Sequence, residues 1–181
     1  MYLAVSGTCY WCMEAVFSSL RGVSDVEQGF VKSKDGRYVE AAVFRIDESI
    51  TRLEDIVSVH LATHSSTANH SARKKYPSAI YPMESNRLGQ CDFAIGLAAK
   101  AYSEAVITQA KPFVAFYPNP NTQQHYFWRQ PDKPFCQNTI LPKLKALAVR
   151  FPTLIKPKAV QYLSASINAK QAKEKRREGA F

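Results

Sequence analysis

The sequence lacks any hydrophobic run near the roughly 18–20 residues needed to cross a bilayer, which argues against a membrane helix. It has no internal repeat, and residues 1–5 lack the basic stretch and long apolar core of a secretory signal. We therefore expect a cytoplasmic protein in a reducing compartment. Of the 181 residues, 46% are hydrophobic and 22% are charged, which is ordinary for one globular domain and excludes wholesale disorder.

Cysteine is scarce, with four residues in the whole chain: Cys9, Cys12, Cys91 and Cys136. A chain of this size does not need disulfides to hold its fold, and cysteine pairs of reducing compartments are more often catalytic or metal-bound. A zinc site would need two ligands beyond the Cys9-x-x-Cys12 pair. The sequence has no second C-x-x-C motif, although two histidines four residues apart, at 60 and 64, leave zinc as a lesser alternative.

Positive charge is unevenly placed along the chain. There are 24 Lys+Arg against 15 Asp+Glu, a net charge of +9, and residues 151–181 hold seven of the basic residues but only two of the acidic ones. We expect a folded domain in residues 1–151 and a basic tail in residues 152–181 that is helical or frayed. Basic patches can bind nucleic acid, but no RNA-binding signature is present, so we do not expect a nucleic-acid partner.

Strand and helix patterns alternate along the first half of the chain. Asp35-Gly36 predicts a hairpin turn, and Thr51-x-x-Glu54 predicts a capping box at a helix start. The βαββαβ order predicts an α/β fold with a ferredoxin-like two-layer core and a C-terminal extension. The predicted segments are strand 2–6, helix 11–20, strands 23–31 and 38–46, helix 53–61 and strand 78–81, followed by helix 84–103, strand 105–117 and helix 138–150.

The residues with the most chemistry form the run Gly7-Thr-Cys-Tyr-Trp-Cys-Met-Glu14. Cys9 falls where a strand ends and a helix begins, so the free N–H groups and positive helix end are expected to lower the pKa of its thiol. Cys12 lies one helical turn further on, close enough for a disulfide. The pair therefore indicates a redox dithiol, although two small residues that only pack in a core remain an alternative.

The run from Gly7 to Val23 resembles the signature of A-type peptide methionine sulfoxide reductases, Gly-Cys-Phe-Trp-Cys/Gly-x-Glu followed by an apolar helix that ends in Gly-Val. Later segments resemble the family in the same order, so that the likeness covers roughly residues 2–151. These are Tyr38-Val-Glu-Ala-Ala-Val (His-Ala-Glu-x-Val), Lys75-Tyr-Pro-Ser-Ala-Ile-Tyr81 (Gln-Tyr-Arg-Ser-x-Ile-Tyr), Thr108 to Phe127 (Thr-Glu-Ile…Phe-Tyr-Pro-Ala-Glu-x-x-His-Gln-x-Tyr) and Phe135-Cys136 with Ile140-Leu-Pro-Lys-Leu144 (Tyr-Cys-x-x-x-Ile-x-Pro-Lys-Leu).

The resemblance implies an enzyme that reduces the S epimer of methionine sulfoxide, free or in proteins. The thiolate of Cys9 would attack the sulfoxide sulfur, and Glu40, with a pKa raised in an apolar pocket, would protonate the departing oxygen. Tyr76 would hydrogen-bond that oxygen. Tyr10 and Trp11 would hold the S-methyl group, and Tyr38 would stand in for a tyrosine of a family loop that is shortened here.

The resemblance further implies that Cys9 becomes a sulfenic acid, which a second thiol converts to a disulfide. Cys12 is the first choice as that thiol, and Cys136 lies where the family often keeps a recycling cysteine. An external dithiol such as thioredoxin would reduce the disulfide, with no bound cofactor or metal, and we expect a monomer. Cys91 matches no family position and is predicted to pack in the core. A general thiol–disulfide oxidoreductase or redox sensor that uses Cys9 and Cys12 is the alternative.

The chain departs from the family in the segment Asn119-Pro-Asn-Thr-Gln-Gln124, which replaces Ala-Glu-x-x-His-Gln and so loses a Glu and a His. A buried polar network that loses members normally needs replacements. The candidates are Asn121, Gln123, Gln124 and His70. We also expect Glu14 to lie on the helix surface or behind the site, and His64 to pack near it.

Overall fold

The computed structural model describes residues 1–32, 34 and 36–166. The described residues form one mixed six-stranded sheet in the order β5-β4-β1-β3-β2-β6. β5 pairs with β4 in parallel, and every other neighbouring pair is antiparallel. An α/β fold is thus confirmed. The strand bounds are β1 Tyr2–Ser6, β2 Val23–Lys32, β3 Tyr38–Ile46, β4 Ala79–Pro82, β5 Gln109–Ala110 and β6 Ala115–Pro118.

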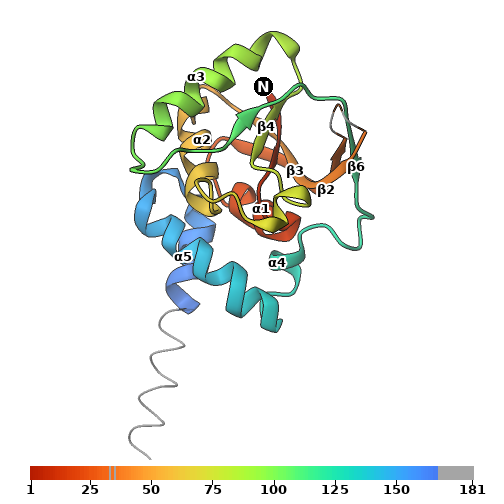
Figure 1. Cartoon of the computed structure of the whole chain (residues 1–181). Coiled ribbons are helices and arrows are strands. Elements are labelled where there is room, and N and C mark those ends of the chain that lie inside the picture. Colours follow the sequence, from red (N-terminus) through yellow and green to blue (C-terminus); the bar gives the residue numbers. More distant parts are fainter. Residues whose placement is uncertain (33, 35, 167–181) are drawn as a thin grey trace, which may run out of the picture.

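The strand predicted at 105–117 is wrong as a single element, because the structure has two short strands at opposite edges of the sheet. Figure 1 shows the chain leaving β5 and crossing to β6 on the far side. Pro112 lies in the break between them and has no N–H to continue a ladder, which is consistent with an interruption there. The hairpin predicted between β2 and β3 is confirmed, with Lys32 opposite Tyr38.

Helices lie at most of the predicted places; α1, α3 and α5 are shorter than predicted, whereas α2 runs two residues further. Their bounds are α1 Tyr10–Ser18, α2 Leu53–Thr63, α3 Leu88–Ala99, α4 Tyr126–Arg129 and α5 Leu141–Arg150. A π-helical turn, Cys136–Ile140, precedes α5 and carries one of the four cysteines. The capping box predicted before α2 does not form, because the Thr51 hydroxyl donates to the carbonyl of Arg21 at 2.7 Å and ties α2 to the end of α1.

The main core lies between the sheet and the helices. It includes Leu3, Phe17 and Phe44, and the two phenylalanine rings stack with their centroids 4.4 Å apart. A smaller apolar cluster around Val39 and Tyr81 covers the opposite face of the sheet. Because both faces are buried, the strand residues that carry chemistry are held in fixed positions at the edge of a packed core.

The described part of the predicted tail packs against this core. Ile155, Ala159 and Leu163 are buried, and the ammonium of Lys156 donates to the carbonyls of Ser18 and Val23 at 2.9 and 2.8 Å. Residues 157–166 are helical, and the rest of the predicted basic tail, 167–181, lies outside the described residues. No helix in the described part of the chain is long and apolar enough to span a membrane.

Candidate active site

Cys9 is the N-cap residue of α1, directly after the turn that follows β1. Its carbonyl accepts hydrogen bonds from the N–H groups of Cys12 and Met13 at 3.0 and 3.2 Å. The Cys9 thiol is half-buried, and its pKa is lowered because the Cys12 thiol and the backbone N–H groups of Trp11 and Cys12 hydrogen-bond the thiolate. These bonds outweigh the burial of Cys9 and the nearby negative charge of Glu40, both of which raise that pKa. A thiolate at a helix start is thus favoured, as the sequence predicts.

Cys12 is the opposite kind of thiol. It is buried, and its pKa is raised because its proton is held in the hydrogen bond to Cys9 and because burial disfavours a second thiolate. Cys12 therefore stays protonated and stabilises the charge on Cys9. Both cysteines are free thiols in this structure, as are Cys91 and Cys136.

The turn that carries Cys9 rests on the ring of His64. A Cβ atom added at Gly7 would lie 2.7 Å from His64 Cδ2, so only glycine fits there. His64 Nδ1 lies 2.6 Å from the carbonyl oxygen of His60 and must donate to it, which leaves Nε2 to accept from the Ser78 hydroxyl at 2.7 Å. Burial lowers the pKa of His64 to about 2, so the ring under the turn is neutral.

Arg73 fastens this turn to the loop before β4, a role that the sequence patterns did not predict. Its guanidinium donates to the carbonyls of Gly7 and Tyr76 at 3.2 and 3.1 Å, and to those of Ser65 and Ala68. Guanidinium groups suit such a task because they present five donors in a fixed plane. Arg73 thereby sets where Tyr76 lies relative to Cys9.

Glu40 is buried on β3 and faces the start of α1. Its Oε2 accepts a hydrogen bond from the N–H of Tyr10 at 3.1 Å, and its Oε1 lies 3.0 Å from the ammonium of Lys75. The Lys75 ammonium also lies 5.0 Å from the centroid of the Tyr76 ring. The structure thus brings the predicted Cys9, Glu40 and Tyr76 into one cluster and adds Lys75 between the last two.

The aromatic residues between the two cysteines line an apolar region next to Cys9. Trp11 stacks on Tyr126 with ring centroids 4.2 Å apart and meets Phe135 edge-on at 5.7 Å. Tyr10 meets both Trp11 and Phe30 edge-on, at 5.4 and 5.7 Å. Tyr126, Phe30 and Phe135 are therefore members of this aromatic cluster that the motif alone did not single out.

Tyr38 shares a strand face with Glu40 but lies at the rim of the site. Its side chain is 53% exposed, its ring meets Tyr117 edge-on at 5.2 Å, and the Lys32 ammonium lies 5.9 Å from its centroid. Tyr117 lies on the edge strand β6, opposite Phe30 of β2, and so joins Tyr38 to the aromatic cluster.

The two remaining cysteines are both buried. Cys136 lies in the π-helical turn before α5, where burial raises the pKa of its thiol, and its charge would raise the pKa of Cys12. Cys91 lies in the core on α3, and burial raises its pKa to about 11. The prediction that Cys91 is a core residue is confirmed.

Amide side chains of the segment Asn119–Gln124 form a hydrogen-bonded network with Gln28. The side chain of Gln124 pairs with the backbone of Gln28, accepting from its N–H at 2.9 Å and donating to its carbonyl at 2.8 Å. The Asn119 amide donates to the Gln28 side chain oxygen. Of the four candidates, Gln124 is thus the one whose side chain makes hydrogen bonds within this network, in the described part of the chain. Gln123 and Asn121 contribute carbonyls alone, and His70 is an exposed residue at the start of a 3₁₀ turn.

Glu14 is not on the helix surface. It is fully buried in α1 and accepts hydrogen bonds from the N–H groups of His125 and Tyr126, the latter at 2.9 Å. Burial raises the pKa of Glu14, against the effect of these donors. The carboxylate therefore fastens the start of α4 to α1. The spacing of apolar residues along a helix does not reveal such a role.

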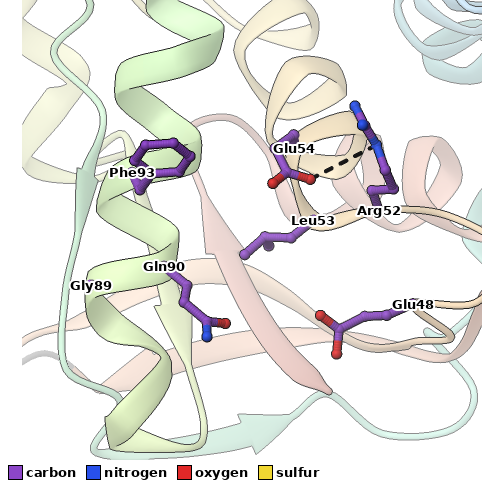
Figure 2. A pocket seen from close by; sticks show the side chains of 7 residues that line it. All are labelled: Glu48, Arg52, Leu53, Glu54, Gly89, Gln90 and Phe93. Atoms are coloured by element: carbon purple, nitrogen blue, oxygen red, sulfur yellow. Dashed lines mark ion pairs between the residues drawn. The ribbon is translucent and has the colours of Figure 1, made fainter.

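A separate cavity of 380 Å³ lies between the start of α2 and α3 (Figure 2). Leu53, Gln90 and Phe93 line it together with charged residues, and Arg52 and Glu54 form an ion pair at 3.9 Å. It contains none of the cysteine-site residues. Elsewhere in the described ranges, no group of three or more His, Cys, Asp or Glu residues could hold a metal ion. The Cys9 cluster thus remains the candidate site.

The chain is similar to known proteins over most of its length. The sequence model described as "Peptide methionine sulfoxide reductase" matches residues 2–153. "Peptide methionine sulfoxide reductase MsrA" of Erwinia tasmaniensis is 27% identical over 173 residues, covering 86% of this chain and 97% of that protein. Methionine sulfoxide reductase A of Corynebacterium diphtheriae has a TM-score of 0.61 at 17% identity, covering 72% of this chain and 74% of that one. Mxr1 from Saccharomyces cerevisiae, in complex with Trx2, has a TM-score of 0.54 at 13% identity, covering 68% and 82%.

Proposed function

The chain belongs to the peptide methionine sulfoxide reductase family and is, by that membership, a peptide-methionine (S)-S-oxide reductase; from this premise we propose that Cys9 is its nucleophile. The observation that carries the proposal is the lowered pKa of the Cys9 thiol at the start of α1, beside a protonated Cys12. A thiolate, and not a thiol, attacks an electrophilic sulfur.

In the first step, the Cys9 thiolate attacks the sulfoxide sulfur and the sulfoxide oxygen gains a proton. We place Glu40 and Tyr76 at that oxygen, Glu40 as the acid, because Glu40 accepts the Tyr10 N–H beside Cys9 and Lys75 contacts both Glu40 and the Tyr76 ring. The oxygen moves from the substrate sulfur to Cys9, which becomes a sulfenic acid, and methionine leaves as the reduced product. Tyr10 and Trp11 supply apolar contacts for the S-methyl group, and Tyr38 contacts the substrate at the rim.

In the second step, a further thiol condenses with the sulfenic acid and releases water. We assign this step to Cys12, because its thiol already hydrogen-bonds Cys9. Cys136 is the candidate for a later exchange that moves the disulfide toward α5, since it is close enough to affect the pKa of Cys12. An external dithiol then reduces the enzyme, and the complex of Mxr1 with Trx2 supports a thioredoxin-like protein in that role.

We further propose that the catalytic domain comprises residues 1–151 and has a ferredoxin-like two-layer core. The order β4-β1-β3-β2 with all pairs antiparallel supports this, since it is the order of a split βαββαβ unit. β5 and β6 extend that sheet at its two edges.

The test is an assay with dithiothreitol and separated S and R epimers of methionine sulfoxide, both free and within a peptide. We expect the protein to consume the S epimer alone, Cys9→Ser to have no detectable turnover, and the matched control Cys91→Ala to stay active. Unchanged turnover in Cys9→Ser would sink the assignment. Reduction of insulin disulfides without any reduction of the sulfoxide would favour a general thiol–disulfide oxidoreductase instead.

A further inference from the structure

We propose that a cationic cavity behind the candidate active site binds an acidic side chain of the polypeptide substrate, a few residues from the methionine sulfoxide. This inference rests on the proposed function, because it concerns which sulfoxide-bearing polypeptides the chain selects. The cavity, here called the lysine pocket, has a volume of 330 Å³. Two prolines line it together with Val39, Tyr81 and three basic residues, Lys34, Arg37 and Lys111.

The lysine pocket lies on the face of the sheet that is opposite the main core. Val39 and Tyr81 belong to the smaller apolar cluster that covers this face. Lys111 directly follows β5 and begins the segment that crosses to β6 (Figure 1). Lys34 and Arg37 come from the hairpin between β2 and β3. The hairpin, the crossing segment and the sheet together form the walls of the pocket.

Positive charge without a nearby acid is the first argument. No acidic side chain of the described residues lines the pocket. The ammonium groups of Lys34 and Lys111 have no ion-pair partner in the described part of the chain. A cleft lined by charge of one sign and walled by apolar groups concentrates ligands of the opposite sign. The two lysines therefore favour a carboxylate whose methylene groups contact the apolar walls.

The position of the pocket next to the Cys9 cluster is the second argument. Val39 precedes Glu40 on β3, and neighbouring strand residues point to opposite faces of a sheet. Pro77, which also lines the pocket, follows Tyr76 directly. The pocket and the candidate site therefore lie at the same end of β3, on its two faces. Extended polypeptide spans roughly 3.3 Å per residue, so a side chain a few positions from the sulfoxide can reach the pocket around the end of the sheet.

The size of the pocket and the nature of its cations indicate how it acts. A volume of 330 Å³ is at the lower end of the range for ligand sites and suits one side chain. Lysine ammonium groups act as point charges, so they accept either oxygen of a carboxylate without a fixed geometry. This contact forms when the polypeptide binds and persists through the reaction. It should therefore lower KM and leave kcat unchanged.

The test compares short peptides that carry one central methionine S-sulfoxide and either Glu or Gln at one other position, scanned from about two to four residues on each side. At low ionic strength the unaltered protein should have a kcat/KM about threefold to tenfold higher for the Glu peptide at one or more positions. This is the size expected of one or two exposed ion pairs. In the double variant of Lys34→Gln and Lys111→Gln, the ratio of Glu to Gln peptide should fall close to one.

The net charge of +9 would by itself attract acidic peptides, so the control removes two charges elsewhere. The double variant of Lys74→Gln and Lys100→Gln, at exposed lysines outside the pocket, should keep the preference for the Glu peptide. Reversal of both pocket charges, by Lys34→Glu with Lys111→Glu, should instead favour a peptide with Lys at the same position. Turnover of free methionine S-sulfoxide, which has no flanking residues, reports that each variant has folded.

Three results would overturn the inference while the proposed function stands. The first is equal kcat/KM for the Glu and Gln peptides at every position in the unaltered protein. The second is a preference for the Glu peptide that survives loss of both pocket lysines. The third is an equal loss of that preference in the control variant, which would mean that net charge alone selects the peptide. Absence of turnover of every sulfoxide by the unaltered protein contradicts the proposed function itself, and this inference with it.

Discussion

At the scale of single residues, the thiols of Cys9 and Cys12 differ in acidity although they lie one helical turn apart. The pKa of Cys9 is lowered chiefly by the hydrogen bond from Cys12, and the pKa of Cys12 is raised by the same bond and by burial. The helix start adds two backbone donors to Cys9. In the mechanism we propose, Cys9 is therefore the thiol that attacks, and Cys12 keeps its proton until a sulfenic acid has formed.

Replacing Cys12 with alanine tests this division. Loss of the donor should raise the pKa of Cys9, and each unit of increase cuts the thiolate fraction near neutral pH about tenfold. Alkylation of Cys9 by iodoacetamide, followed by mass spectrometry across pH 5 to 9, measures the change. Cys91→Ala is the matched control and should leave the Cys9 profile in place. A Cys9 profile that Cys12→Ala does not move would contradict the account of its acidity.

Cys9, Glu40, Tyr76, Tyr10 and Trp11 could be placed from the sequence, because each falls within a short motif that the family shares. The partners that set their behaviour could not be placed in this way. Arg73 reaches the carbonyl of Gly7 across 66 positions of sequence, and such a bond depends on tertiary structure that no local pattern encodes. Lys75 precedes Tyr76, and in the sequence it is marked only by the lysine that stands where the family segment has glutamine.

At the scale of elements, polar contacts hold α1 at its middle and at its C-terminal end. Glu14 accepts two backbone N–H groups at the start of α4, and Trp128 donates from its indole to the Ser18 hydroxyl at 2.8 Å. The Lys156 ammonium also donates to the backbone carbonyl of Ser18. The segment with Tyr126 is thereby fixed against Trp11, which closes one side of the aromatic cluster.

Glu14→Gln should weaken this attachment. Glutamine has one acceptor oxygen for two N–H groups, so one backbone donor is left facing an amide donor. The loss should cost about 1.5–3 kcal/mol of the free energy of unfolding, the usual contribution of a hydrogen bond to a charged group. Urea denaturation at pH 7 measures it, with Glu27→Gln on the exposed side of β2 as control. Equal stability of Glu14→Gln and the unaltered protein would argue against the anchoring role.

Element order was predictable, whereas element ends were not. The βαββαβ order follows from apolar spacing and turn residues, and the structure has it. The single strand predicted at 105–117 is wrong because Pro112 falls within it and its two ends pair at opposite edges of the sheet. The capping box at Thr51 is also wrong, since a tertiary partner, the carbonyl of Arg21, takes the hydroxyl instead.

At the scale of the whole molecule, the buried His60 and the half-buried His64 link the core to the site. His60 Nε2 bonds the carbonyl of Ser6 at 2.9 Å, and burial lowers the pKa of His60 to about 4. His64 supports Gly7 and has a pKa of about 2 for the same reason. Both rings are neutral when folded but bind protons when unfolded, with an ordinary pKa near 6.5.

This difference gives stability a pH dependence of known sign. The pKa of His60 is lower in the folded than in the unfolded protein, so the free energy of unfolding is not reduced by this ring above about pH 6.5. As the pH falls from about 6.5 toward about 4, the unfolded protein binds a proton at His60 and the folded protein does not, so the free energy of unfolding decreases. Between pH 7 and pH 5 each ring should account for a loss of roughly 2 kcal/mol in the free energy of unfolding. Between pH 7 and pH 5, the free energy of unfolding of His60→Gln should therefore fall by roughly 2 kcal/mol less than that of the unaltered protein. Urea denaturation at both pH values measures this difference.

The exposed His70 supplies the control, because His70→Gln should keep the pH dependence of the unaltered protein. A His60→Gln variant whose stability falls by as much as that of the unaltered protein would mean that His60 does not bind its proton on unfolding. The comparison of variants is needed because burial raises the pKa of Glu14, which changes stability with pH in the opposite direction.

The most direct measurement for the central claim is a count of free thiols before and after one turnover with the S epimer of methionine sulfoxide, without added reductant. The reduced chain has four thiols, and one catalytic disulfide removes two of them. The account predicts that two thiols and one sulfoxide are consumed per chain, and that Cys9→Ser consumes neither. Methionine formation that leaves all four thiols free, or that persists in Cys9→Ser, would contradict it.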